Sequence, residues 1–206
     1  RVRGEDFTFL PYSTAVGGVI VAKDSPIRDL AGLRGKRIGI SGGPVDKSWL
    51  ILRAWSRKLL GEDLADITEQ VFGAPPLIMN AAETGQVDAA INLWHLQALM
   101  QARGMREIAS VAQAAQALGL DARTPLLGYV LRDKWIAANP ERARGLAHAS
   151  RAAKDLLVRD DAAWQPLRRY MDAKDEAEFQ ALRAGWRAGV PLDAPVDVAN
   201  AQRPFS

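Results

Sequence analysis

The sequence predicts an α/β fold built around a parallel sheet, and three features support this. Between residues 36 and 93, short β-branched runs alternate with segments of helical periodicity in the order strand, helix, strand, helix, strand. Such alternation is typical of parallel strands joined by right-handed crossovers. Hydrophobic residues make up 48% of the 206-residue chain, which is enough for a sizeable core. No internal repeat or low-complexity tract interrupts the pattern.

Each element of the first half rests on its periodicity and on the turn residues that end it. The expected strands are residues 7–13 (FTFLPYS), 17–27, 36–40, 67–73 and 87–93, and the expected helices are residues 29–33, 44–60 and 76–85. The helix over 44–60 has the clearest pattern, because apolar residues recur at helical spacing from Val45 to Leu59. Gly35, Gly61 and Gly85 follow the three helices and are expected to end them.

The second half is predicted to be mostly helical. Along the chain we expect a short amphipathic helix at residues 96–104, a strand at 106–111, an irregular or helical connection at 112–124 and a strand at 126–133. From residue 135 onward the pattern is helical, with Asn139 as a cap and Pro140 as the first residue of a helix. Residues 189–206 contain several prolines and are expected to trail over the surface.

Composition excludes several kinds of chemistry. The chain has no cysteine, which excludes disulfides, thiolate catalysis and cysteine metal ligands. Its two histidines, His95 and His148, are far apart in the sequence, which gives a transition-metal site little support. Metalloprotease, nucleophile-elbow, EF-hand, phosphate-loop and dinucleotide motifs are absent. We therefore expect no metal site, no cofactor and no enzymatic activity.

Charge and hydropathy indicate a globular protein that does not bind nucleic acid. The formal net charge is +3, but Lys and Arg are interleaved with Asp and Glu, as in residues 141–161, and no nucleic-acid-binding motif accompanies them. No run of about 18 uninterrupted apolar residues exists, so no membrane-spanning helix is expected. The first ten residues of the given chain, RVRGEDFTFL, carry charges where a secretory signal would need an apolar stretch.

The junction between the strand at 36–40 and the next helix is the main candidate for binding. In open α/β sheets, the crevice at the carboxyl ends of the strands is the usual ligand site. The first-turn amides of a helix lack partners and lie at the positive end of its dipole, so they can hold an anionic oxygen. Gly42 and Gly43 would let a ligand approach the backbone, and Ser41 or Ser48 could donate a hydrogen bond. The alternative is that residues 41–44 form an ordinary tight turn.

Asp46 complicates this interpretation. A carboxylate in the first turn competes with a bound anion for the same amides, and it could simply cap the helix. Lys47 beside it could partly neutralise its charge.

Three segments, in this order, resemble a known family. They are residues 24–43 (DSPIRDLAGLRGKRIGISGG), residues 83–93 (ETGQVDAAINL) and residues 128–149 (GYVLRDKWIAANPERARGLAHA). Together they resemble the type II periplasmic solute-binding proteins of ABC importers, in particular the nitrate, taurine and aliphatic-sulfonate binders. The resemblance extends from about residue 7 to about residue 190. It implies two α/β lobes joined by crossover strands, with a ligand held in the cleft between them.

The resemblance also implies a division of the chain. Residues 1–35 would be the end of lobe 1 and the first hinge strand, residues 36–123 lobe 2, and residues 124–206 the second hinge strand, the return to lobe 1 and the C-terminal helices. The hinge strands would be residues 17–23 and 126–132. Most of the family's first lobe has no counterpart in the given sequence, so lobe 1 is expected to be incomplete. Its exposed sheet edge could allow self-association.

Ligand-binding residues are carried over from the family by position. Ser41, Gly42, Gly43, Pro44 and Val45 match the second-lobe loop, Trp94 and His95 follow the second-lobe strand, and Pro11, Tyr12 and Ser13 match the end of the last first-lobe strand. Family members often have Glu-Pro where this chain has Trp94 and His95. The contact chemistry at these two positions is therefore an open point.

For several of these residues a structural role is the alternative. His95 either contacts the ligand or is a surface histidine that caps the next helix. Trp94 is the best candidate for a ligand-facing aromatic side chain, because its ring offers a flat face and one donor. Trp49 could belong to the core or to the cleft. Trp55, Trp135 and Trp186 are expected to lie in the core, and structural roles are expected for His148 and Asp88.

The expected function is that of the solute-binding component of an ABC import system. It would capture a small anion such as a sulfonate or nitrate in the interlobe cleft, in the periplasm, and present it to a membrane permease. One alternative is an enzyme, or a thiamine-precursor-binding relative, on the same fold. The other is the ligand-sensing effector domain of a regulator.

Overall fold

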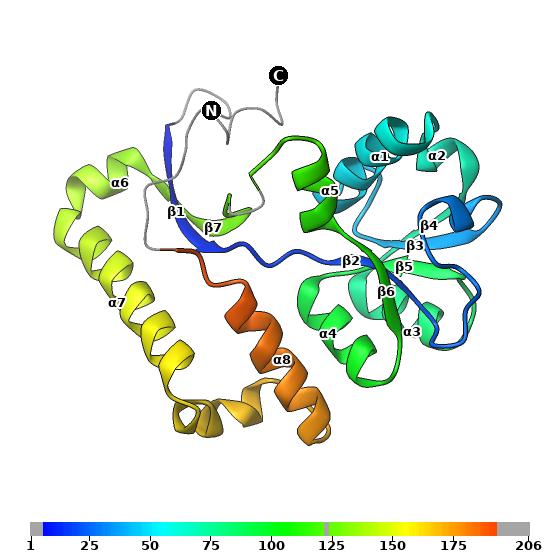
Figure 1. Cartoon of the computed structure of the whole chain (residues 1–206). Coiled ribbons are helices and arrows are strands. Elements are labelled where there is room, and N and C mark those ends of the chain that lie inside the picture. Colours follow the sequence, from blue (N-terminus) through cyan, green and yellow to red (C-terminus); the bar gives the residue numbers. More distant parts are fainter. Residues whose placement is uncertain (1–5, 122–123, 193–206) are drawn as a thin grey trace.

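The computed structural model describes residues 6–121 and 124–192, which form two sheets with helices around them (Figure 1). The larger sheet has five strands in the order β4-β3-β5-β2-β6, which are Glu69–Gly73, Arg37–Ser41, Ala89–Ile91, Gly18–Val21 and Arg106–Ser110. The smaller sheet pairs β1 (Phe7–Ser13) with β7 (Leu127–Arg132) in antiparallel fashion. The predicted α/β class is confirmed.

The larger sheet is mixed, so the prediction of a parallel sheet is wrong for β2. Strand β3 runs parallel to β4 and β5, whereas β2 is antiparallel to β5 and β6. Between β2 and β3 the chain has only the short 3-10 helix η1 (Ala31–Leu33) and no crossover helix, so β3 starts from the edge at which β2 ends. The expected hinge strand at 17–23 therefore contributes a central strand. All of β2 is buried, because it is covered on both faces.

Helices cover both faces of this sheet (Figure 1). In chain order the helices are α1 (Lys47–Leu60), α2 (Leu64–Ile67), α3 (Pro75–Glu83), α4 (Trp94–Ala102), α5 (Val111–Ala117), α6 (Asp133–Ala138), α7 (Pro140–Arg159), the 3-10 helix η2 (Ala162–Tyr170) and α8 (Glu176–Ala188). Helices α1 and α5 pack on one face, and α3 and α4 pack on the other. The expected connection at 112–124 is thus helical over α5.

The alternation of side chains along the strands divides the core into two layers. Val19 and Val21 join the cluster under α1 and α5, whereas Ile20 joins the cluster under α3 and α4. On β3 the position that faces α3 is Gly39, where a Cβ would stand 3.0 Å from a methyl carbon of Ile78. Glycine at this position lets α3 pack close to the sheet.

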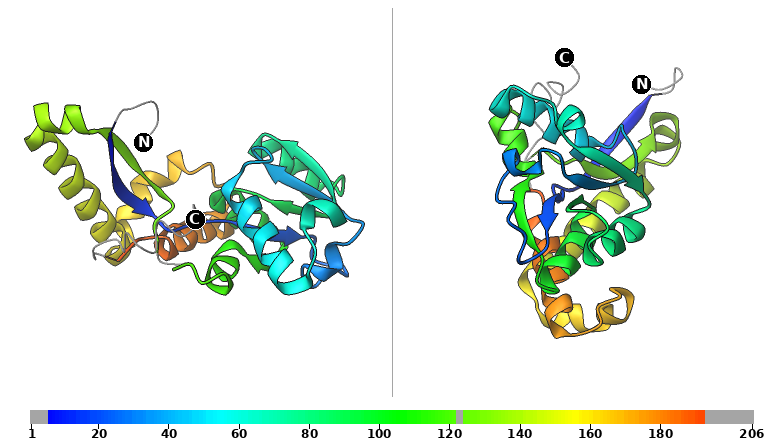
Figure 2. Two further views of the ribbon diagram at one scale, coloured as in Figure 1. Left: turned by 90° about the horizontal axis from the view of Figure 1, so that it is seen from above. Right: turned by 90° about the vertical axis from the view of Figure 1, so that its right-hand side faces the viewer.

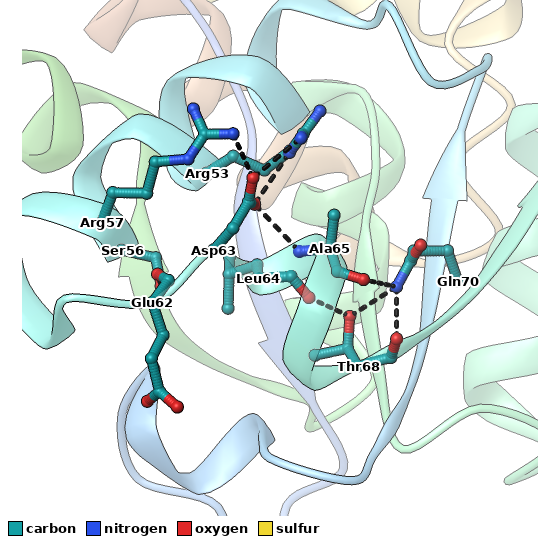
Figure 3. A network of polar contacts seen from close by, with 9 residues as sticks. All are labelled: Arg53, Ser56, Arg57, Glu62, Asp63, Leu64, Ala65, Thr68 and Gln70. Atoms are coloured by element: carbon teal, nitrogen blue, oxygen red, sulfur yellow. Dashed lines mark hydrogen bonds and ion pairs between the residues drawn. The ribbon is translucent and has the colours of Figure 1, made fainter.

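Two arginines of α1 hold the start of α2 through one carboxylate (Figure 3). Asp63 accepts two hydrogen bonds from Arg53, both of 2.8 Å, and one from Arg57. The same carboxylate caps α2 by accepting the amide of Ala65 at 2.9 Å. Asp63 is buried, and the hydrogen bonds from Arg53 hold the pKa of its carboxyl group well below the usual value. Helix α2 was not predicted, although Asp63 is a typical capping residue.

The smaller sheet and the C-terminal helices form the other part of the molecule (Figures 1 and 2). Helix α8 lies beside α4, and the amide of Thr14 donates to the carbonyl of Gly189 at 2.8 Å, which ties the segment after β1 to the end of α8. Phe7 and Phe9 on one face of the smaller sheet are 40% and 45% exposed. None of the described helices is both long and apolar enough to cross a membrane.

The two tryptophans of α1 lie in or against the core, whereas the tryptophan of α6 does not. Trp49 is 1% exposed and belongs to the core, as does the partly buried Trp55. The core prediction is wrong for Trp135, which is 39% exposed because α6 buries none of its residues. Pro140 begins α7 as predicted, but the Asn139 side chain does not cap it; its amide group donates to the carbonyl of Trp135 instead. Most of the expected surface tail, residues 193–206, and residues 122–123 lie outside the described residues.

Candidate functional site

One edge of the larger sheet gathers the loops that could contact a ligand. The parallel strands β3, β4 and β5 all end there, with Ser41 opposite Gly73 and Ile40 opposite Ile91. Because β2 is antiparallel, it begins at the same edge, and Val19 pairs with Ile91. The predicted elbow and the start of α4 therefore lie along one edge of the sheet, where ligands usually bind in open α/β sheets.

At the elbow, helix α1 already has an anion at its N-terminus. The Asp46 carboxylate accepts the amides of Ser48 and Trp49 at 2.9 and 3.1 Å. The expectation that these first-turn amides are free is therefore wrong, and the capping alternative for Asp46 is confirmed. The physical reason is that a side chain of the same chain satisfies the amides at no cost in binding entropy.

Of the other elbow residues, Gly42 forms the turn, and Pro44 and Val45 are exposed to solvent. Gly42 has a positive φ of 95°, and its amide donates to the carbonyl of Gly73 at 2.9 Å. Val45 is 82% exposed, and Pro44 is also exposed. Ser41 as a residue is buried, but its hydroxyl oxygen, which makes no hydrogen bond within residues 6–121 and 124–192, is not fully enclosed. A ligand role for Ser41, Gly42, Gly43, Pro44 and Val45 stays a prediction.

Helix α4, in contrast, starts without a cap. Its N-cap residue is Leu93, which offers no side-chain acceptor. In the described part of the chain, the amides of Trp94, His95 and Leu96 donate to no protein acceptor, and the first amide bonded back to the turn is that of Gln97. These three amides lie at the positive end of a nine-residue helix. They have the properties that were expected from the sequence for the start of α1.

The Asn92 side chain explains why α4 is uncapped. Its oxygen accepts the amide of Leu93 at 2.8 Å, and its nitrogen donates to the carbonyl of Pro75 at 2.9 Å. Asn92 is buried, and both polar atoms of its side chain are occupied by hydrogen bonds that join the end of β5 to the start of α3. The residue that could have capped α4 is therefore turned away from its amides.

A cavity of about 560 Å³ lies next to the uncapped start of α4. Its walls come from the first turns of α3 and α4 and from η2, α8 and the loop between them: Pro75, Pro76, Leu93, Trp94, His95, Leu96, Leu99, Trp164, Tyr170, Met171, Asp172, Leu182 and Trp186. Four of these residues have aromatic side chains other than imidazole. The cavity thus combines free amide donors with flat apolar walls, which suits a small molecule that has an oxyanion and an apolar part.

Trp94 and His95 are the two predicted site residues that the structure brings into this cavity. Their rings contact each other edge to face, with centroids 5.6 Å apart. Burial lowers the pKa of His95, because desolvation disfavours the charged imidazolium. His95 therefore enters the wall of the cavity as a neutral ring at neutral pH.

Tyr12 and Ser13 take part in packing around α8. The Ser13 hydroxyl donates to the carbonyl of Gly189 at 3.1 Å and accepts the amide of Ala15 at 3.0 Å. The Tyr12 hydroxyl accepts a hydrogen bond from the indole of Trp186 at 3.2 Å. Tyr12 thereby orients a wall of the cavity from outside, and direct ligand contact by Tyr12 or Ser13 stays a prediction.

Sequence reasoning missed the aromatic wall that faces α4. Trp164 and Trp186 contact each other edge to face with centroids 5.2 Å apart, and Tyr170 is 69% exposed at the rim. A large exposed aromatic residue such as Tyr170 is a weak signal of a binding surface.

The structural role expected for Asp88 is confirmed, since it accepts the amide of Arg37 at 2.8 Å. Within the described residues, no three His, Cys, Asp or Glu side chains gather closely enough to hold a metal ion.

Comparisons with known proteins agree with this fold. A family model described as NMT1/THI5 like matches residues 11–163. The alkanesulfonate-binding protein SsuA from Xanthomonas axonopodis pv. citri, bound to MOPS, has a TM-score of 0.71 at 22% identity, over 98% of this chain and 65% of that chain. The periplasmic aliphatic sulphonate binding protein SsuA from Escherichia coli has a TM-score of 0.64 at 18% identity, over 97% of this chain and 65% of that chain.

An enzyme shares the same architecture more distantly. A mutant of DszB in complex with biphenyl-2-sulfinic acid has a TM-score of 0.52 at 20% identity, over 94% of this chain and 69% of that chain.

A search of the curated proteins found no match. This chain spans slightly less than two thirds of the length of the two SsuA chains, at 65% of each. The chain belongs to the NMT1/THI5-like family and has the type II periplasmic binding protein fold seen in the sulfonate-binding proteins.

Proposed function

We propose that this chain is part of the solute-binding component of an ABC import system and captures a small organic anion in the aromatic cavity beside α4. One observation carries the proposal: the amides of Trp94, His95 and Leu96 have no acceptor in the described protein, and all three residues line that cavity. A bound oxyanion would satisfy these donors and gain from the helix dipole.

A sulfonate with an apolar substituent fits this chemistry best. Its three oxygens can accept several amides at once, and its apolar part can lie against Trp94, Trp164 and Trp186. The two SsuA proteins, whose names state that they bind alkanesulfonates or aliphatic sulphonates, support this class of ligand. Nitrate and other small oxyanions would use the same amides but leave the aromatic walls unfilled.

Capture would be non-covalent. A ligand that contacts both the α3–α4 side and the η2–α8 side stabilises the arrangement in which the two sides are close, and it shifts the population by its differential affinity. We infer a location in the periplasm and a membrane permease as partner, because the family resemblance and the periplasmic SsuA proteins point to both. The expected lobe boundaries and self-association through the β1–β7 sheet remain proposals as well.

An enzyme on the same fold is the second candidate, and the likeness to DszB favours it. The DszB structure is that of a cysteine-to-serine mutant, whereas this chain contains no cysteine. A catalytic role would have to use the histidine, carboxylate or hydroxyl groups near the cavity, such as His95, Asp172 and Tyr170. Loss of an aromatic sulfinic acid during incubation with the protein, followed by chromatography, would support this candidate.

A thermal-shift screen tests the proposed function. The panel contains hexanesulfonate, taurine, nitrate, bicarbonate, hexanoate and an uncharged aminopyrimidine that stands for a thiamine precursor. A ligand that binds only the folded state adds about 2.7 kcal/mol to the free energy of unfolding at a hundredfold excess over Kd. The midpoint temperature of unfolding rises as a result. The proposal predicts the largest rise with hexanesulfonate. A rise with the aminopyrimidine alone would overturn the assignment of an anionic ligand.

A further inference from the structure

A second cavity, of about 760 Å³, shares Trp94 with the first as a lining residue. It is formed by the segment before β2, by one face of α4, by one face and the C-terminal end of α8, and by single residues of β6 and α5: Thr14, Ala15, Val16, Trp94, Gln97, Ala98, Gln101, Glu107, Ala112, Ala181, Ala184, Gly185, Ala188, Gly189, Val190, Pro191 and Leu192. Most of these side chains are small and apolar. The cavity volume lies within the range of small-molecule sites.

Glu107 is the one charged side chain among these lining residues. No lysine, arginine or histidine of the described chain contributes to the wall, so the carboxylate has no cationic partner there. Helix α8 also ends at this cavity, with Ala188 and Gly189 in the wall, and the C-terminal end of a helix is the negative end of its dipole. The positive N-terminal ends of α4 and α5 also reach this cavity, at Trp94 and Ala112, and oppose the end of α8. Glu107 carries the one formal charge among the lining residues, so it sets the sign of charge that the cavity favours in a ligand.

A buried glutamine fixes the position of this carboxylate. The Gln97 side chain is 4% exposed; its oxygen accepts the amide of Gly18 at 2.5 Å, and its nitrogen donates to one oxygen of Glu107. The other oxygen of Glu107 has no hydrogen-bond donor within the described residues. Burial raises the pKa of Glu107, since its negative charge is only partly compensated. A cation in the cavity would supply the missing compensation.

We propose that this second cavity binds a small organic cation of the primary alkylammonium class. The ammonium group would donate to the free oxygen of Glu107 and lie toward the end of α8, and the alkyl chain would lie among Ala98, Ala184 and Gly185. The face of the Trp94 ring would add a cation–π or apolar contact. This inference is independent of the proposed function, because it concerns a different cavity and the opposite charge.

Titration of the full chain with butylammonium chloride, followed by NMR, tests the proposal. We expect saturable shifts of the backbone amides of Gly18, Gln97, Glu107 and Gly189. Because a hydrogen bond to a charged group contributes strongly to binding, Glu107→Gln should weaken the affinity on the order of tenfold or more. Ala184→Leu, which puts a larger side chain into the cavity wall and leaves the charge in place, should also weaken it. Butanol and butyrate should bind far more weakly than butylammonium.

Glu141→Gln is the matched control, because Glu141 has an exposed side chain on α7 and the substitution removes the same charge. Its affinity for butylammonium should equal that of the unmodified protein. Equal affinity in the Glu107→Gln and unmodified proteins would overturn the proposal, as would the absence of saturable shifts in the unmodified protein. If Glu107→Gln fails to fold, unchanged affinity in Ala184→Leu would overturn the proposal in its place.

Discussion

The indole ring of Trp94 packs against Gly185 of α8, where a Cβ would stand 3.3 Å from two atoms of the ring. Trp94 lines both cavities, and this contact joins the start of α4 to α8. Because Gly185 has no side-chain carbon, α8 can pack close to the candidate site.

Replacement of Gly185 by alanine should show that this contact is tight. In a helix interior, glycine to alanine normally stabilises by about 0.5–1 kcal/mol. Gly145 of α7 is the matched control, since a Cβ there meets no atom within 4 Å. We expect the full gain for Gly145→Ala and a smaller gain or a loss for Gly185→Ala in urea denaturation. Equal gains would show that the Trp94 ring is free to move away.

Removal of the Asp46 side chain separates the two helix N-termini as anion sites. Asp46→Ala should lower the free energy of unfolding by about 1 kcal/mol, because α1 loses its cap. Asp46→Ser should keep most of that stability. The affinity for hexanesulfonate, measured by calorimetry, should not change in either variant. Tighter binding in Asp46→Ala would mean that the anion competes for the amides of α1.

Protonation of Asp63 should be the main cause by which acid weakens the α1–α2 junction and lowers the free energy of unfolding. Its pKa in the folded state is lowered, mainly by the hydrogen bonds from Arg53, so its contribution is complete above the unfolded-state pKa of about 3.9 and declines as the pH falls below that value. Asp63→Asn should cost roughly 2 kcal/mol at pH 7 because the arginines lose their partner.

Denaturant midpoints measured from pH 7 down to about pH 2 check this. The difference between the Asp63→Asn and unmodified proteins should shrink as the pH falls. A constant difference over the whole range would show that the carboxylate does not titrate differently in the folded protein.

Trp94→Ala should weaken the binding of the solute that the thermal-shift screen identifies, by roughly tenfold, because one aromatic wall is lost. Trp94→Phe should retain part of the affinity. Trp135→Ala is the control, since Trp135 is exposed on α6 and lines neither cavity described above. Unchanged affinity in Trp94→Ala would refute the assignment of this residue to the site.

The sequence was sufficient to predict the local elements but not their long-range partners. Periodicity alone predicts the strand that ends near Ser41 and the helix that follows it. The glycine at position 61 predicts the end of that helix, and in the structure it has the left-handed conformation, with φ 73°. The cap by Asp46 was also among the predicted alternatives. The direction of β2 was not predictable from a short apolar run, because such runs look alike in parallel and antiparallel sheets.

The candidate site shows the same limit. Trp94 and His95 could be selected because they follow a buried strand at the ligand edge of the sheet. That Trp164 and Trp186 complete the cavity depends on how α8 packs against α4, which no local pattern specifies. The uncapped start of α4 was readable in principle, since Leu93 at the N-cap position offers no acceptor.

A crystal structure determined with hexanesulfonate bound would show whether the start of α4 holds the anion. We expect sulfonate oxygens about 3 Å from the backbone nitrogens of His95 and Leu96, with the alkyl chain against the Trp94 ring. A sulfonate bound at the elbow of residues 41–45, away from α4, would contradict it.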